Sequence, residues 1–185
     1  EAAKIFERWD PARKIAVQYW PQGEGGDLRM QNPYWIAYRN PRNTDKKRYM
    51  ANVSIAFDIL PWLNVSGRAK IDNTNSIFTQ KLYASSNTTI TEGSTQGHYT
   101  EIRNTDEQIY ADVMVNINKT FADNKFSLVA NVGASVNDTK SKELSYRGPI
   151  REVGIPNMFT VFDLDKEKSR AQKYGWQEQT QSIFA

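Results

Sequence analysis

The residues of this chain that could carry out acid–base or metal chemistry are few and scattered. The one histidine, His98, lies in a segment of Gly, Thr and Tyr residues, and the chain has no cysteine. A zinc site or a Ser-His-Asp triad needs partners that this segment does not offer. Asp163, Asp165 and Glu167 could give oxygen ligands to calcium, but two lysines interleave with them and the EF-hand glycine is missing. We therefore expect no enzyme, no catalytic residue, no metal site and no cofactor.

Aromatic side chains near the start of the chain could take part in a different chemistry, the recognition of sugars. A flat apolar ring fits the C–H face of a pyranose. The same rings could instead hold the segment together or contact a partner protein. Both interpretations stay open for five candidates: Trp9, Tyr19, Trp20, Tyr34 and Trp35.

The elements that must position such residues are predicted from two stretches of alternating sequence. Each stretch alternates apolar and polar residues, turns within a few residues and alternates again. We predict one β-hairpin over residues 48–83 with its turn at 58–62, and a second over 99–146 with its turn at 122–125. The apolar side of the first strand is typical of the pattern: Tyr49, Ala51, Val53, Ile55, Phe57 and Ile59.

Polar residues take the other side of the same strands. If the strands belong to a barrel, this side faces the lumen, where its residues would contact a substrate or a domain that fills the lumen. Seven residues are the candidates for such contacts: Arg68, Lys70, Asp72, Asp112, Asn116, Asn118 and Asn131.

The connections between the predicted strands differ strongly in length at the two ends. They take about four residues at one end and a dozen or more at the other, which is typical of outer-membrane barrels with short periplasmic turns and long extracellular loops. Trp62, Phe121 and Phe126 stand beside the short turns, where an aromatic girdle would meet the membrane interface. No apolar run approaches the roughly 18 residues of a membrane-spanning helix.

The number of predicted strands implies a larger assembly. Four strands and the start of a fifth cannot close a barrel, whose smallest single-chain form has about eight. The chain also begins at Glu1 without an initiator methionine, so we expect a piece of a longer protein. The net charge of +3 comes from 24 basic and 21 acidic residues spread along the chain, so no nucleic-acid partner is expected.

The sequence resembles SusC/RagA-type TonB-dependent transporters over essentially all of its length. The likeness is carried by Gln31-Asn32-Pro33-Tyr34-Trp35-Ile36, by the hairpin centre Pro61-Trp62-Leu63-Asn64-Val65-Ser66-Gly67-Arg68, and by Asn104-Thr105-Asp106 leading into Tyr110-Ala111-Asp112. These motifs belong to wall strands and turns. They are specific for the family and uninformative about the substrate.

The resemblance implies a fold and a function. It implies about four to five strands of a 22-stranded barrel in the outer membrane of a Gram-negative bacterium, filled by a plug domain that these residues do not contain. It also implies a SusD-type surface lipoprotein as cap, energy from the TonB complex through the missing plug, and import of oligosaccharides or glycan fragments. Peptide import is a possibility within the same family.

The expected layout of residues 1–185 follows from the hairpins and the resemblance together. Extracellular loop regions are expected at 1–47, 84–98 and 147–173, hairpins at 48–83 and 99–146, and the start of a further strand at 174–185. The alternative is a secreted, soluble β-sandwich that binds carbohydrate. Such a sandwich would bury its alternating apolar face and would not alternate short and long connections.

Overall fold

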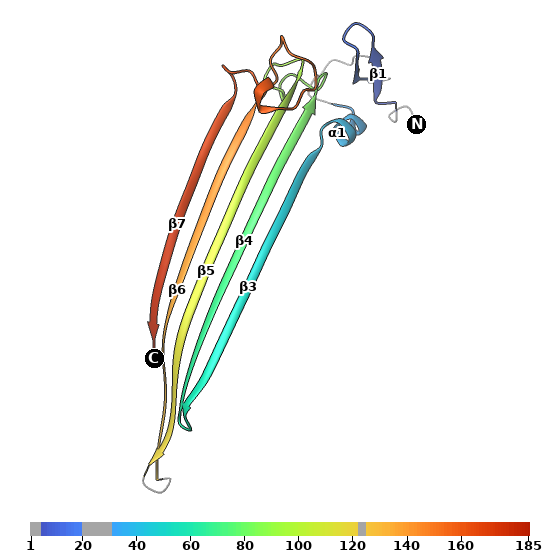
Figure 1. Ribbon diagram of the computed structural model, residues 1–185. Helices are drawn as coiled ribbons and strands as arrows, with labels where there is room; N and C mark the ends of the chain where they lie inside the picture. The colour runs from blue at the N-terminus through green and yellow to red at the C-terminus, as the bar shows by residue number, and fades with distance from the viewer. Residues whose placement is uncertain (1–4, 20–30, 122–124) are drawn as a thin grey trace. The chain divides into compact units, whose positions relative to one another are not determined.

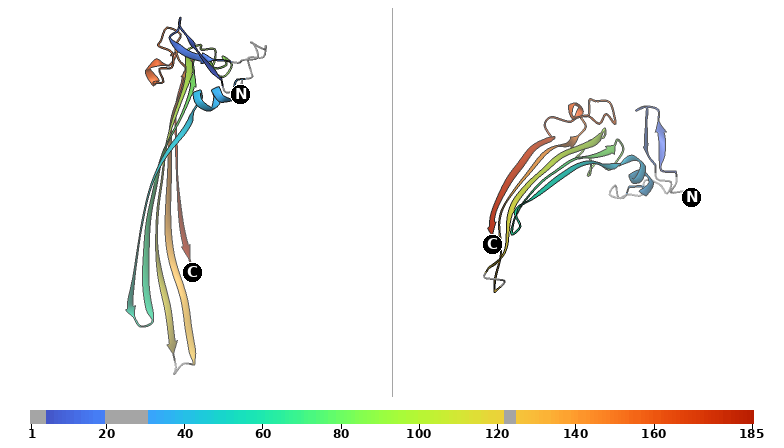
Figure 2. Two further views of the ribbon diagram at one scale, coloured as in Figure 1. Left: turned by 90° about the vertical axis from the view of Figure 1, so that its right-hand side faces the viewer. Right: turned by 60° about the horizontal axis from the view of Figure 1, so that its bottom comes forward.

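The computed structural model describes residues 5–19, 31–121 and 125–185. They form a two-stranded sheet of β1 (Glu7–Asp10) and β2 (Ile15–Gln18), a helix α1 (Pro33–Arg39) and a five-stranded sheet in the order β3-β4-β5-β6-β7. Neighbouring strands of the larger sheet run antiparallel (Figures 1 and 2). The antiparallel, all-β character predicted from the alternation is confirmed.

The five strands of the larger sheet are long. They are β3 (Arg42–Leu60), β4 (Leu63–Tyr83), β5 (Gly97–Phe121), β6 (Phe126–Pro149) and β7 (Arg170–Phe184), and a short 3-10 helix η2 (Val161–Asp163) lies between the last two. Both predicted hairpins are present as β3–β4 and β5–β6. The turn predicted at 122–125 lies almost wholly outside the described residues.

The first 47 residues contain more regular structure than the loop region that we expected. The Asp10 carboxylate accepts hydrogen bonds from the backbone N–H groups of Ala12 and Arg13 at 2.9 and 3.2 Å, which closes the tight β1–β2 turn. Asn32 caps α1 by accepting from the Tyr34 N–H, and Pro33 follows at the first helical position. Strand β3 begins at Arg42, whereas we predicted a start at Arg48. The prediction missed the first residues of the strand because they are polar on both faces and show no alternation.

The last expected loop is also shorter than predicted. Strand β6 continues to Pro149 and β7 begins at Arg170, where we expected a loop over 147–173. An isolated antiparallel bridge pairs Ile150 with Leu164 inside the connection. No helix among the described residues is long and apolar enough to cross a membrane.

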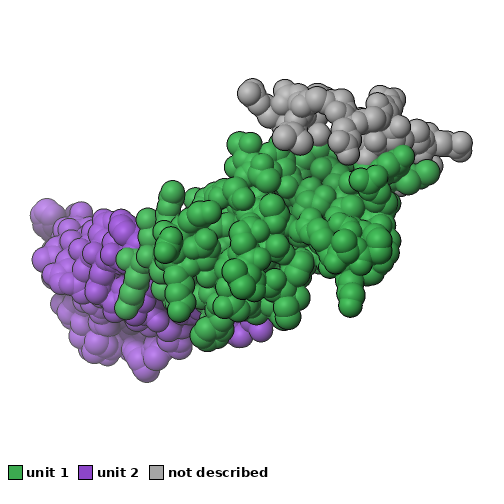
Figure 3. Space-filling view, turned by 90° about the horizontal axis from the view of Figure 1, so that it is seen from above, with its two compact units in different colours: residues 1–45, 76–103, 143–173 green, residues 46–75, 104–142, 174–185 purple. Residues whose placement is uncertain are grey.

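The chain divides into two compact units, coloured green and purple in Figure 3. Unit 1 comprises residues 1–45, 76–103 and 143–173, and unit 2 comprises residues 46–75, 104–142 and 174–185. All the buried apolar side chains of the described residues belong to unit 1: Trp35, Leu82, Ala84, Tyr99, Pro149, Ile150 and Leu164. Within the described part of unit 2, no apolar side chain is buried.

Unit 1 is held together by contacts between its three segments. The Trp35 indole donates from Nε1 to Ser86 Oγ at 2.9 Å, and that hydroxyl donates to Asn40 Oδ1 at 3.0 Å. The Ser94 hydroxyl donates to the Ile150 carbonyl at 2.7 Å. Gly97 has a φ of +116°, and a Cβ there would lie 2.6 Å from the Leu82 carbonyl oxygen, so only glycine fits.

Candidate functional site

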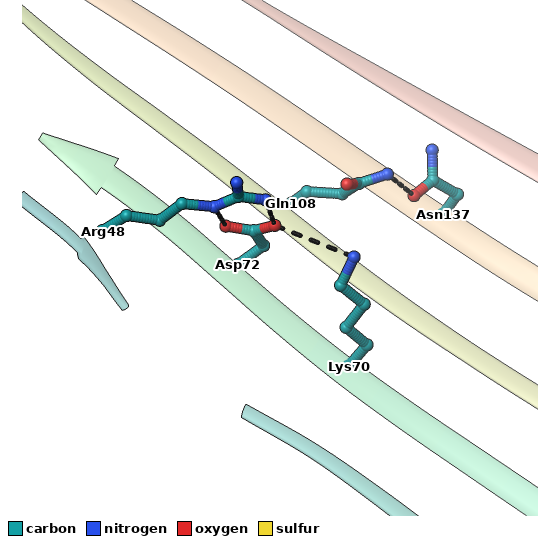
Figure 4. Close-up of polar contacts among 5 residues, drawn as sticks. All are labelled: Arg48, Lys70, Asp72, Gln108 and Asn137. Carbon is teal, nitrogen blue, oxygen red and sulfur yellow. Dashed lines mark hydrogen bonds and ion pairs between the residues drawn. The ribbon is translucent and has the colours of Figure 1, made fainter. Parts of the chain in front are cut away.

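One face of unit 2, the polar face, carries a ladder of charged contacts between neighbouring strands. Arg48 on β3 donates two hydrogen bonds to Asp72 on β4, at 2.8 and 2.5 Å, and Lys70 Nζ lies 3.7 Å from the same carboxylate (Figure 4). Arg68 on β4 donates from Nε to Asp112 on β5 at 2.9 Å. These pairs continue from one strand to the next along the sheet.

Neutral side chains extend the ladder. Asn116 Nδ2 donates to Asn64 Oδ1 at 3.1 Å, and Gln108 Nε2 donates to Asn137 Oδ1 at 2.9 Å, the latter drawn in Figure 4. Five of the seven residues predicted for a lumen face therefore belong to the network of contacts on the polar face. Asn118 and Asn131 are exposed and make no side-chain hydrogen bond with the described residues.

The opposite face of unit 2, the apolar face, is exposed. Phe57 is 65% exposed, Val113 48% and Val132 47%, whereas the Asp112 side chain is only 2% exposed. Two carboxylates of unit 2, Asp72 and Asp112, are thus covered while large apolar side chains of its other face are exposed, the reverse of the usual burial in a water-soluble protein. A contiguous apolar surface of this kind marks contact with an apolar environment or with a partner.

A cluster of one lysine and two aromatic rings lies beside the short β3–β4 turn. Lys119 Nζ lies 4.2 Å from the Trp62 ring centroid and 5.3 Å from that of Phe121. The backbone N–H of Asn118 donates to the Trp62 carbonyl at 2.9 Å, which holds the turn against β5. A cation over aromatic rings at a strand end suits an interface between apolar and aqueous surroundings.

A concave pocket of about 850 Å³ lies within unit 1. Alternate residues of β4 and β5 form one wall, so they share a face of each strand, and α1 contributes Ile36 and Ala37. Its charged and titratable side chains come from four segments: Arg42, Glu92, His98 and Arg147. This pocket was not predicted from the sequence, although three alternate residues of β4, Phe78, Gln80 and Leu82, line it.

His98 lies in the pocket wall with its side chain 6% exposed, and its Nε2 is 3.7 Å from Glu92 Oε1. Burial lowers the pKa of His98 below its ordinary value, while the Glu92 carboxylate acts in the opposite direction. Nδ1 has no hydrogen-bond partner among the described residues. The imidazole is therefore favoured in its neutral form.

The five aromatic candidates have different surroundings. Trp35 is fully buried in the core of unit 1, so it offers no surface to a ligand or a partner. Tyr34 stacks on Phe6 at 6.4 Å between ring centroids, and the Arg8 guanidinium lies 5.7 Å from the Tyr19 ring. Trp9 is 64% exposed. Trp20 lies outside the described residues.

The acidic residues near the chain's end have structural partners. Asp163 accepts from Arg151 at 2.9 Å and from the Thr160 hydroxyl at 2.6 Å. Asp165 accepts from the backbone N–H of Glu167. No group of three or more possible metal ligands occurs within the described ranges of the chain.

The connection between β6 and β7 presents apolar side chains to solvent. Val153 is 99% exposed and Phe162 89%. Ile155, Met158 and Val161 are also exposed. This set, the apolar loop surface, is the most exposed hydrophobic group of unit 1.

No protein-family model matches the chain, and no curated protein matches its sequence.

Proposed function

We propose that this chain forms part of the wall and the outer face of a SusC/RagA-type TonB-dependent transporter in a Gram-negative outer membrane. Its function is to import oligosaccharides or glycan fragments, and it works by binding and energy-coupled translocation without covalent chemistry. The observation that carries the proposal is the reversed burial of unit 2. A barrel wall has this property because lipid covers the apolar face and the lumen side is polar.

The length of the apolar band supports a membrane crossing. On β3 it extends from Tyr49 to Ile59, which is roughly 33 Å at about 3.3 Å per residue. A strand tilt of about 40° reduces this to about 25 Å, the usual height of the apolar band of such barrels. The Trp62–Lys119–Phe121 cluster would then lie at the periplasmic interface.

The edges of the larger sheet support a larger wall. Within the described residues, β3 and β7 each pair with a neighbour on one side only. Unpaired backbone groups are not tolerated in lipid, so further strands would pair with both edges. The 22-stranded plugged barrel of this transporter family would supply them.

The apolar loop surface supports a protein partner outside the membrane. Exposed apolar side chains such as Val153 and Phe162 suit an interface with a SusD-type surface lipoprotein. Trp9, also exposed, would contribute to the same cap or touch the substrate. TonB would act through a plug domain, and a peptide is the alternative cargo.

The proposal can be tested by single-cysteine labelling, because the chain has no cysteine of its own. Val113→Cys and Val132→Cys should be protected in membranes from a water-soluble maleimide and should place a spin label in contact with lipid-dissolved oxygen. Asn118→Cys and Asn131→Cys are the matched controls, which should react with a water-soluble reagent once detergent opens the lumen. Equal labelling of both sets, or a protein that is monomeric and folded without detergent, would support the soluble β-sandwich instead.

A further inference from the structure

The pocket of unit 1 carries more positive than negative charge. Its ionised side chains are the guanidinium groups of Arg42 and Arg147 and the carboxylate of Glu92. His98, the other titratable group in the wall, is favoured in its neutral form. The remaining lining residues among those described are apolar or neutral, so the described lining has a net charge of about +1.

No carboxylate of the described residues forms an ion pair with either guanidinium group. With its amide oxygen turned toward Arg42, Gln80 accepts hydrogen bonds from Nε and Nη2 at 3.1 and 3.2 Å, and it contributes no charge. Arg147 makes no ion pair within the described ranges of the chain. Glu92 stands beside His98 instead. Both guanidinium groups therefore keep N–H donors for an acceptor that enters the pocket.

The rest of the wall is mixed in chemistry. Ile36, Phe78 and Ile90 give it apolar surface, while Gln31 and Thr100 bring an amide and a hydroxyl group. A saturated ring with hydroxyl groups fits such a wall, because its C–H face packs on apolar groups and its edges form hydrogen bonds. A guanidinium binds a carboxylate with two parallel hydrogen bonds, more favourably than it binds a neutral hydroxyl group.

We propose that this pocket binds the acidic sugar of an oligosaccharide, a uronic acid, with its carboxylate held by Arg147 and Arg42. Glu92 stands beside His98, and its negative charge disfavours a ligand carboxylate next to it, which leaves the two guanidinium groups as the favoured contacts. The sugar part of the inference rests on the proposed function. The carboxylate part does not, because it follows from the charges of unit 1 alone.

Calorimetric titration of the purified protein in detergent tests the inference. The probes are a trigalacturonate, the neutral galactose trisaccharide as its uncharged counterpart, and a tripeptide rich in glutamate. We expect the trigalacturonate to bind about tenfold or more tightly than either of the others. Arg147→Gln and Arg42→Gln should each remove about tenfold of that affinity, whereas Lys166→Gln, the same charge change at an exposed site outside the pocket, should leave it unchanged.

Glu92→Gln should change the affinity for trigalacturonate in the opposite direction. It removes the carboxylate that the described lining residues contribute, so trigalacturonate should bind more tightly, with no change for the neutral trisaccharide. Equal affinity for the acidic and neutral sugars, or no effect of both arginine substitutions, would overturn the carboxylate site. Peptide binding as tight as that of trigalacturonate would overturn the assignment to a sugar.

An uptake assay separates this inference from the proposed function. Cells that carry the wild-type protein would be given labelled trigalacturonate with and without an energised TonB system. Binding by the pure protein without energy-dependent uptake would contradict the transporter and leave the pocket intact. Uptake that survives Arg42→Gln and Arg147→Gln together would contradict the pocket and leave the transporter intact.

Discussion

Arg68 and Asp112 form an ion pair of unequal partners. The Arg68 side chain on β4 is 61% exposed, whereas the carboxylate that it contacts at 2.9 Å on β5 is 2% exposed. An exposed pair contributes little to stability, but a covered carboxylate left without its donor is unfavourable. The two substitutions that break the pair should therefore have different effects.

We expect Arg68→Met to destabilise the protein more than Asp112→Asn. The first leaves a covered carboxylate unsatisfied, and the second replaces it with an amide that still accepts a hydrogen bond from Arg68. The temperature at which the folded band disappears in heat-modifiability gels would rank the two variants. The double variant should recover part of the loss, and an additive double variant would show that the pair is not coupled.

Val132 and Asn131 are neighbours on β6 that should respond differently to charge. If Val132 faces lipid at mid-membrane, Val132→Arg should cost about 2 to 4 kcal/mol of the free energy of unfolding. Asn131→Arg places the same side chain on the opposite face and should cost much less. Folding titrations into lipid vesicles measure both values, and equal costs would contradict the assigned faces.

Gly133 and the Phe184 ring approach each other closely within unit 2. A Cβ on Gly133 would lie 2.4 Å from the ring and 3.0 Å from the Val113 carbonyl oxygen. We expect Gly133→Val to lower the thermal stability, and the loss should be smaller when Phe184→Ala removes the ring. Lack of any such rescue would mean that the backbone contact, and not the ring, limits this position.

Trp35 should be the most sensitive aromatic residue of unit 1. Trp35→Ala removes a fully buried indole and its hydrogen bond to Ser86, so a loss of about 3 to 5 kcal/mol is expected. Limited proteolysis of the loops of unit 1 would report it. Trp9→Ala is the control, because Trp9 is 64% exposed and should change stability little.

His98 should make the stability depend on pH. Its folded-state pKa is lowered by burial, so the unfolded chain binds the proton more readily. Its contribution is therefore complete above the unfolded pKa of about 6.5 and is lost as the pH falls toward the folded value. The melting temperature should fall less between pH 7.5 and 5.5 in His98→Gln than in the wild type, with Glu92 and Arg147 retained in both.

Alternation predicted the strands of this chain because a long part of each hairpin keeps a period of two, as at Val53, Ile55 and Phe57. It did not predict where β3 begins, because the residues after Pro41 are polar on both faces. The β1–β2 hairpin depends on the turn at Asp10, and α1 depends on the N-cap at Asn32. The Pro- and Gly-rich composition of this region led us to expect a loop instead.

The pocket could not be predicted for a different reason. Arg42, Glu92 and Arg147 are far apart in the sequence, and they line the same pocket only because the folded chain brings their segments together. The polar face could be predicted from the sequence, because Asp72 and Asp112 follow the alternation of their strands. Their partners Arg48 and Arg68 depend on the register between strands, which the sequence does not state.

The core of unit 1 has a consequence for assembly. A hairpin that slides by two residues keeps every side chain on its proper face, so the alternation cannot distinguish the native alignment from its neighbours. The Ser94 hydroxyl on the Ile150 carbonyl and the Asn157 amide oxygen on the Ala84 N–H can form in one alignment only. The contacts of unit 1 thus favour one strand alignment, and substitutions that weaken them should raise the fraction of protein with misaligned strands.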